Sequence, residues 1–135
     1  MRGDMIKTVI AAVVSNYGLT FLVIGFIASA VAIYRSPRPV SRAVVVDKLL
    51  TWFVVFNIGV MYLANFIFHV FFGGMAAAFI GWPDSPFQVE VGTASLGFSV
   101  AGFIAVLGGF DRRLVAVIGP GIFMLGAAAG PPARW

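Results

Sequence analysis

Four long apolar runs, separated by short polar connections, dominate the pattern of hydrophobic and polar positions along the chain. The runs cover residues 6–34, 49–72, 89–110 and 114–130. A membrane-spanning helix needs about 20 mostly apolar residues, a length that these runs reach or approach. We therefore predict an all-α integral membrane protein, a single domain of residues 1–135 in which four transmembrane helices form a compact bundle.

The connections contain residues that break helices. Pro37 and Pro39 end the first run, because proline disfavours helix for itself and for the residue before it. The glycine pair at 73–74 ends the second run. The apolar stretch that follows is too short to cross a membrane, so we expect a short interfacial or re-entrant segment between the second and third spans. Pro120, flanked by glycines, predicts a kink in the fourth span.

Small residues line faces of two predicted helices, and small side chains let helices approach closely in a membrane. Gly25 and Ser29 form such a pair in the first span. The third span has two small faces, which we take as a sign of neighbours on two sides. We therefore expect a homo-oligomer or a partner in a larger membrane complex. The two faces consist of Gly92, Ser95, Ser99 and Gly102, and of Gly97, Ala101 and Ala105.

Composition supports the membrane assignment, because 61% of residues are hydrophobic and only 10% are charged. Soluble domains have about 45–50% apolar and 25% charged residues. The net charge of +4 is explained by loops that face the cytoplasm and anionic lipid. We therefore expect the lipid bilayer, and no nucleic acid, as a partner. The absence of cysteine excludes disulfides, thiolate metal sites and a cysteine nucleophile.

The basic residues predict an orientation. Six lie in the first and third connections, namely Arg35, Arg38, Arg42, Lys48, Arg112 and Arg113. Three lie on the side of the termini, namely Arg2, Lys7 and Arg134. Basic loops stay on the cytoplasmic side. We therefore expect both termini and the 73–90 loop on the outer side, although two basic residues before the first span favour the opposite orientation.

Polar residues inside the spans are the first candidates for chemistry, because lipid offers an amide or an imidazole no hydrogen-bond partner. Asn57, Asn65 and His69 form a stripe on one side of the second span, since they are eight and four residues apart. Asn16 and Asn65 fall at similar depths, about 10–15 Å from the outer ends, which predicts an outward-opening polar pocket. The amides line a ligand or ion path, or they form interhelical hydrogen bonds, the interpretation that we favour.

His69, the only histidine, and Glu90 lie at facing ends of consecutive spans. A carboxylate beside an imidazole favours its charged form and orients its tautomer. Such a pair relays protons, binds a cation or a polar headgroup, or simply ties the loop in place. We favour the structural tie.

The loop between these spans adds four candidate ligand-binding residues, Trp82, Asp84, Ser85 and Gln88. Trp82 together with Phe87 stacks on a ring or anchors the chain at the membrane interface, and the anchor is the more common role. His69, Glu90 and Asp84 lack the spacing of metal ligands. We therefore expect no metal and no cofactor.

His69 and the Gly-Trp-Pro-x-Ser-Pro-Phe-Gln-x-Glu-x-Gly run over residues 81–92 resemble a family of small four-span bacterial inner-membrane proteins of unknown function. The resemblance covers about residues 57–110. It implies a four-span protein of the bacterial inner membrane without an assigned activity. It also implies that His69, Trp82, Ser85, Gln88 and Glu90 belong to the family's pattern.

Three hypotheses of function follow. The first is a non-enzymatic accessory or structural subunit that packs through its small-residue faces. The alternative is a small transporter or ligand-binding protein with a pocket around His69, Glu90, Asn65 and Asn16. A membrane enzyme acting on lipid or quinone would have only Glu90 and His69 as acid and base, and no motif of a known catalytic site supports it.

Overall fold

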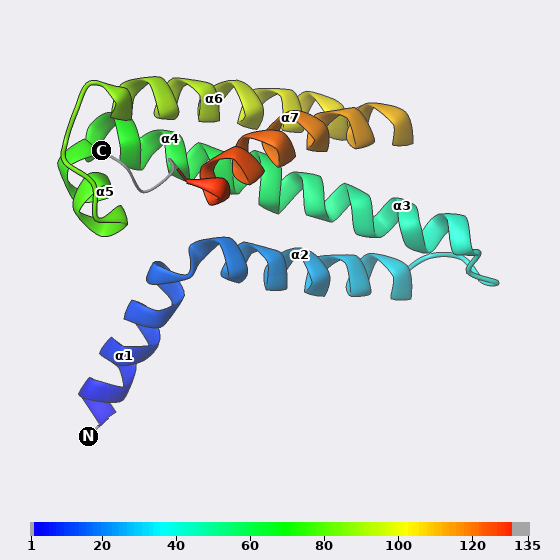
Figure 1. The fold of residues 1–135 in the computed structure, drawn as a ribbon. Helices are drawn as coiled ribbons and strands as arrows, with labels where there is room; N and C mark the ends of the chain where they lie inside the picture. The colour runs from blue at the N-terminus through cyan, green and yellow to red at the C-terminus, as the bar shows by residue number, and fades with distance from the viewer. Residues whose placement is uncertain (1, 131–135) are drawn as a thin grey trace.

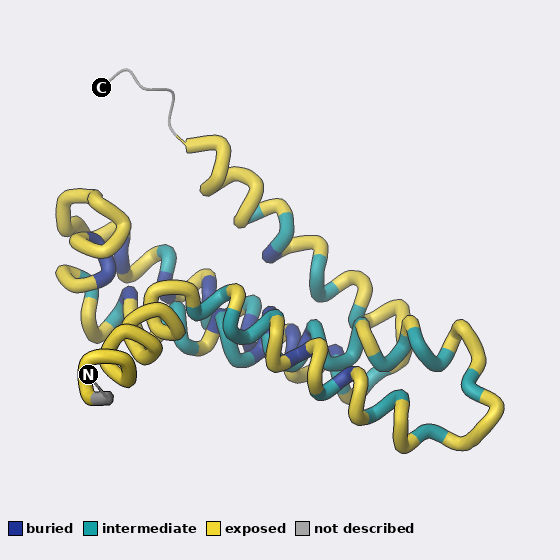
Figure 2. The backbone as a smooth tube through the Cα atoms, turned by 90° about the horizontal axis from the view of Figure 1, so that it is seen from below, coloured by how far each residue is buried: buried dark blue, intermediate teal, exposed yellow. Residues whose placement is uncertain are grey.

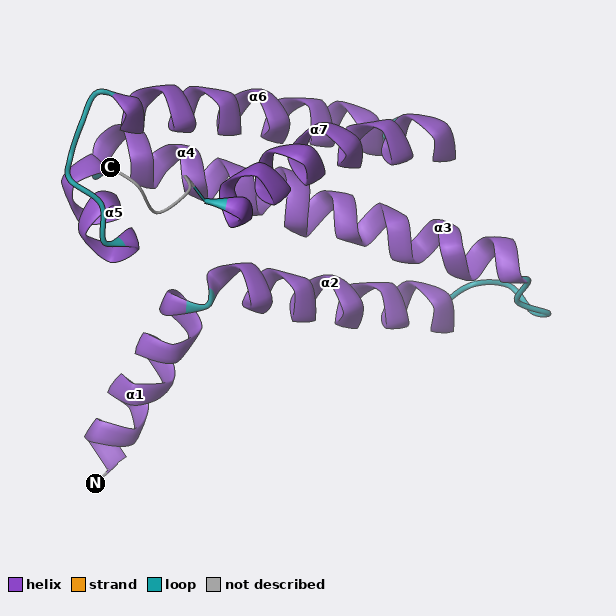
Figure 3. Ribbon diagram, in the orientation of Figure 1, coloured by secondary structure: helices purple, strands orange, loops and turns teal. Residues whose placement is uncertain are grey.

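The structure, a computed structural model, describes residues 2–130. Within this range the chain forms seven α-helices and one π-helical stretch, and no strand (Figure 3). The elements are α1 (Arg2–Ser15), α2 (Tyr17–Tyr34), α3 (Arg42–Phe53), η1 (Val54–Val60), α4 (Met61–Phe71), α5 (Gly73–Ile80), α6 (Phe87–Val106) and α7 (Phe110–Ala129). The C-terminal tail, with Arg134 of the predicted orientation, lies outside the described residues.

Four of these helical stretches are long and apolar enough to cross a membrane. They are Tyr17–Tyr34, Arg42–Phe71, Phe87–Val106 and Phe110–Ala129. The second is one continuous rod made of α3, η1 and α4. The prediction of an all-α protein with four spans is confirmed, and the short segment between the second and third spans is the helix α5 (Figure 1).

The second span begins at Arg42, seven residues before the predicted start at residue 49. Ser41 caps this helix, because its hydroxyl oxygen accepts a hydrogen bond from the Val44 amide at 3.3 Å. At 1.5 Å per residue the rod measures roughly 45 Å, so its first turns extend beyond a hydrocarbon core of about 30 Å. Asp47 and Lys48, which the prediction left outside the span, lie within α3.

The first span is interrupted, and the prediction of a single helix over residues 6–34 is wrong. Asn16 leaves the helical conformation, with φ −118° and ψ 39°, and α1 turns away from the bundle there (Figure 1). Side chains bond the carbonyls around the bend. Ser15 and Asn16 each donate to the carbonyl four residues back, at 2.6 and 2.9 Å, and the Thr20 hydroxyl lies 3.1 Å from the Val13 carbonyl. Such side chains compete with the backbone for hydrogen bonds, which favours a break.

The core lies where α6 packs against α4 and η1, and where α2 packs against α3 and η1. Figure 2 shows the buried positions along these helices, whereas α1 and the end of α7 are exposed. Glycines permit the close approach. A Cβ at Gly102 would stand 2.9 Å from Ile58 Cγ2, and one at Gly92 would stand 2.6 Å from Val70 Cγ2.

Two of the three predicted small-residue faces are thus covered within the chain. The face of α6 that contains Gly92, Ser95, Ser99 and Gly102 is buried. The pair in α2 is also buried: the Ser29 hydroxyl donates to the Gly25 carbonyl at 2.8 Å and lies 3.3 Å from the Lys48 carbonyl of α3. The third face remains open at Gly97 and Ala101, although Ala105 is buried.

Candidate functional site

The polar residues of the second span meet α6 in a series of hydrogen bonds, which we call the polar seam. The polar seam consists of Asn65, His69, Gln88, Ser95 and Ser99. Gln88, Ser95 and Ser99 are seven and four residues apart and therefore share one face of α6. All three are buried. Because α4 and α6 lie side by side and run in opposite directions (Figure 1), the earliest seam residue of α6 meets the latest one of α4.

His69 and Gln88 form the layer of the polar seam nearest to α5. Nδ1 of His69 lies 2.5 Å from Oε1 of Gln88, and the two residues are only 8% and 4% exposed. Because a carbonyl oxygen only accepts, Nδ1 carries the hydrogen and donates it. This bond uses Nδ1 and leaves Nε2 as the ring nitrogen outside the contact.

The predicted contact between His69 and Glu90 is wrong, because Gln88 takes that place. The helix α6 begins at Phe87, so residues 88 and 90 are both helical and point about 200° apart. Glu90 is exposed on the side away from α4. The third span was predicted to start at residue 89, which left Gln88 in the loop. Because α6 starts at Phe87 instead, Gln88 is the helical residue that faces His69.

The middle layer of the polar seam joins three spans. The Tyr17 hydroxyl donates to Oδ1 of Asn65 at 3.0 Å, and Nδ2 of Asn65 donates to the Ser95 hydroxyl at 2.8 Å. Ser95 in turn donates to the Val91 carbonyl of its own helix at 2.8 Å. Sequence reasoning missed Tyr17, because the first span predicted over residues 6–34 placed it in the interior of a helix, whereas it is the first residue of α2.

The third layer uses the π-helical stretch. The Ser99 hydroxyl donates to the Gly59 carbonyl of η1 at 2.7 Å. On the other side of η1, Nδ2 of Asn57 lies 3.5 Å from the Phe21 carbonyl of α2, at the limit of a hydrogen bond. Asn57 and Asn65 therefore bond to neighbouring helices, which is the interpretation that we favoured for the amides.

The other predicted site residues lie outside the polar seam. Asn16 is exposed at the α1–α2 bend, where it bonds its own backbone. Trp82 is 45% exposed, and Ser85 contributes its carbonyl to the Gln88 amide at 3.1 Å, at the start of α6. The Asp84 carboxylate lies beside the first turn of α5, 3.4 Å from where a Cβ of Gly74 would stand. An anion is favoured at that end of a helix.

A second polar cluster lies near the opposite end of the bundle, and sequence reasoning missed it. Nη1 of Arg113, on α7, lies 2.5 Å both from Oδ1 of Asp47 and from the Thr51 hydroxyl of α3. Its Nη2 donates to the Gly108 carbonyl at 2.9 Å. We call these four residues the Arg113 cluster. The arginine side chain is only 12% exposed. Through these contacts it joins α7 to α3 and to the turn between α6 and α7.

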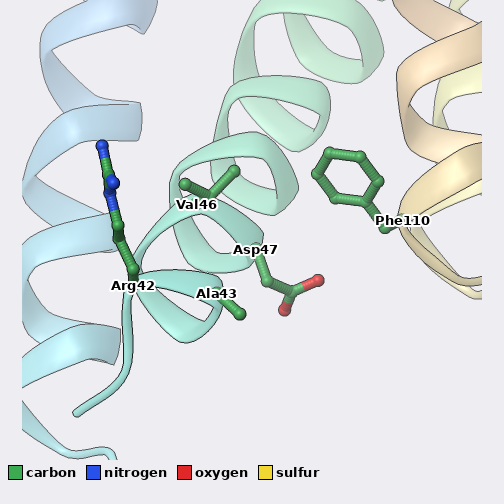
Figure 4. A pocket seen from close by; sticks show the side chains of 5 residues that line it. All are labelled: Arg42, Ala43, Val46, Asp47 and Phe110. Carbon is green, nitrogen blue, oxygen red and sulfur yellow. The ribbon is translucent and has the colours of Figure 1, made fainter.

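Two surface hollows border Asp47. The larger, about 540 Å³, is lined by Arg42, Ala43, Val46, Asp47 and Phe110. Figure 4 shows four of these residues on α3 and Phe110 facing them from α7. The smaller, about 490 Å³, is lined by Ser36, Pro37, Ala43, Val44, Asp47 and Lys48. Both lie at the end of the bundle that holds the basic first and third connections, away from the outward pocket that we predicted around His69.

The polar seam is made of amide, hydroxyl and imidazole groups that hydrogen-bond across the helices. Within residues 2–130 no three histidine, aspartate or glutamate side chains gather closely enough to hold a metal ion. What the arrangement does physically is tie α2, α4 and α6 together through hydrogen bonds between their side chains.

These features define a four-span helical membrane protein held together by an internal polar seam. The chain belongs to DUF6790, a family of unknown function, which it matches over residues 15–135. The match covers all four spans and every residue of the polar seam. No curated protein matches the chain, and no solved structure does.

Proposed function

We propose that the protein is a non-enzymatic accessory or structural subunit of a bacterial inner membrane, which packs against a second copy of itself or against a larger membrane complex. The observation that carries this proposal is an open small-residue face on α6, made by Ala94, Gly97 and Ala101. All three are exposed, and nothing lies within 4 Å of where a Cβ of Gly97 would stand.

The open face lies on the side of α6 opposite the polar seam. Gly97 is about 160–200° around the helix from Ser95 and Ser99, so this face is directed away from α4. Other exposed positions of the spans carry large apolar side chains, such as Ile118 and Leu125 on α7, which suit lipid. A flat face of alanine and glycine instead lets a second helix approach closely.

The chain's lack of cysteine makes a clean test available. A Gly97→Cys variant should form a disulfide-linked dimer, or a cross-link to a co-purifying protein, in the native membrane. Light scattering in mild detergent should report the same assembly. Gly97→Leu should abolish it, whereas Ala30→Leu, the same kind of enlargement on an exposed position of α2, should not. A strictly monomeric protein that purifies with nothing else would refute the proposal.

For the orientation we propose that the basic end faces the cytoplasm, with both termini and the 73–90 loop outside. The support is that the contact between Arg113 and Asp47 brings the first and third connections to one end, which concentrates six of the nine basic residues there. A membrane-impermeant maleimide should label Ser85→Cys but not Pro37→Cys in intact cells. The opposite pattern would invert the topology.

A transporter or ligand-binding protein built around His69 is the second candidate, and one observation favours it. Nε2 of His69 has no hydrogen-bond partner within the described residues, so this nitrogen is available to a proton or a ligand. The absence of a Glu90 contact weakens the candidate. Binding or flux in liposomes, titrated with pH, should then change in His69→Ala. Unchanged behaviour would exclude this function.

A further inference from the structure

We infer that α1 is an amphipathic helix that lies in the plane of the membrane surface, with one half of its circumference in contact with lipid. It would add a lipid-surface binding element to the four-span body. The inference is independent of the proposed assembly through α6, because it concerns a different helix and a different partner.

The first step concerns length. The helix α2 has 18 residues and measures roughly 27 Å at 1.5 Å per residue. This nearly fills a hydrocarbon core of about 30 Å, so α1 does not need to contribute to the span. Because α1 joins α2 directly at Asn16, the last turn of α1 is placed at the membrane boundary. The bend there turns α1 off the axis of α2 (Figure 1).

The second step concerns the two faces of α1. At about 100° per residue, the large apolar residues fall within one half of the circumference. They are Met5, Ile6, Val9, Ile10, Val13 and Val14, each 46–64% exposed. The opposite half contains Asp4, Lys7, Thr8, Ala11, Ala12 and Ser15. A helix with this division, a Lys on the polar side and an exposed apolar half is suited to the headgroup boundary.

The third step selects lipid as the occupant. The residues of α1 pack only on α2, near the bend, among the principal helix contacts, so the bundle does not cover the apolar half. That half carries large apolar side chains, unlike the open face on α6, so it is not shaped for close packing against another helix. The family match also begins at residue 15, so α1 is outside the shared four-span body. Because α1 is continuous with the spanning helix α2, lipid is the apolar phase nearest to its exposed apolar half.

The test uses single cysteines carrying nitroxide labels in the full-length chain, reconstituted in vesicles of phosphatidylcholine and phosphatidylglycerol. Ile6→Cys and Val13→Cys probe the apolar half, and Ala11→Cys is the matched site on the polar half. Ile118→Cys, exposed near the middle of α7, supplies the deep-lipid reference. Collisions with oxygen report lipid, and collisions with a water-soluble nickel chelate report water.

The labels at Ile6 and Val13 should favour oxygen several-fold more than the label at Ala11, at a depth of about 5–10 Å below the headgroups. Equal nickel access at all three sites would place α1 in water and overturn the inference. Protection of the apolar sites from both reagents would show a protein partner or a second copy in place of lipid. Oxygen preference at every site, as at Ile118, would mean that α1 continues the span.

Discussion

The polar seam and the Arg113 cluster both join helices through hydrogen bonds, but they use different chemistry. The polar seam joins amide, hydroxyl and imidazole groups, such as Asn65 and Ser95 at 2.8 Å, whereas the Arg113 cluster joins an arginine to a carboxylate. The Asn65, Ser95 and Ser99 bonds lie inside the spans, where a charged group would be unfavourable in hydrocarbon. Arg113 and Asp47 instead lie near the ends of their spans.

The two regions also differ in how much room they leave. Along the polar seam, glycines of α6 press against side chains of the second span, whereas surface hollows lie beside Asp47 at the other end. Three substitutions and one double-mutant cycle test this contrast through the free energy of unfolding, measured by denaturant titration in mixed micelles. They are ordered from the largest expected effect to the smallest.

Gly92→Leu should have the largest effect, a loss of about 3 kcal/mol in the free energy of unfolding. A Cβ there would stand 2.6 Å from Val70 Cγ2 and 3.4 Å from the Phe66 carbonyl oxygen, so α4 and α6 must separate. Gly126→Leu is the control, because nothing lies within 4 Å of that position; its change should stay below about 0.5 kcal/mol. Equal stability of the two variants would contradict the close approach.

Arg113→Gln should lower the free energy of unfolding by about 1–3 kcal/mol. It removes the guanidinium group that donates to Asp47, Thr51 and Gly108. The neighbouring Arg112 is exposed and serves as the control, because Arg112→Gln removes the same charge without a buried contact. Its effect should lie within about 0.5 kcal/mol. If both variants lost the same stability, net charge and not the cluster would be responsible.

Gln88→Ala should cost about 1 kcal/mol, because it leaves Nδ1 of His69 buried without its partner. Glu90→Ala, two residues on and exposed, should be nearly neutral in the same assay. A larger loss in Glu90→Ala than in Gln88→Ala would contradict the contact between His69 and Gln88 and support the one between His69 and Glu90 that the sequence suggested.

The smallest effect concerns a single link of the polar seam. A double-mutant cycle with Asn65→Ala and Ser95→Ala should give a coupling energy of about 0.6 kcal/mol, the average for hydrogen bonds between membrane helices. The matched cycle of Asn65→Ala with Ser99→Ala should give almost none, since Ser99 bonds the Gly59 carbonyl. Equal coupling in both cycles would mean that the layers are not separate.

Much of the fold was predictable, and less of the site was. The polar stripe of Asn57, Asn65 and His69 was visible because residues on one helix keep a constant angular spacing. The role of Asn16 was not visible, since an asparagine at that depth either bonds another helix or breaks its own. Contacts between distant segments were the hardest to foresee, as with Arg113 and Asp47, which are 66 residues apart.

The sequence by itself determined that the chain is all-α, that it has four spans, and that its polar groups lie within them. It does so because the bilayer sets a length and a polarity that can be counted residue by residue. Only the tertiary structure decided that Gln88 and not Glu90 meets His69, that two small-residue faces are covered internally, and that α1 leaves the bundle. Those outcomes depend on where each helix starts and how it is rotated. A shift of a single residue turns a side chain by about 100°, which no count along the chain resolves.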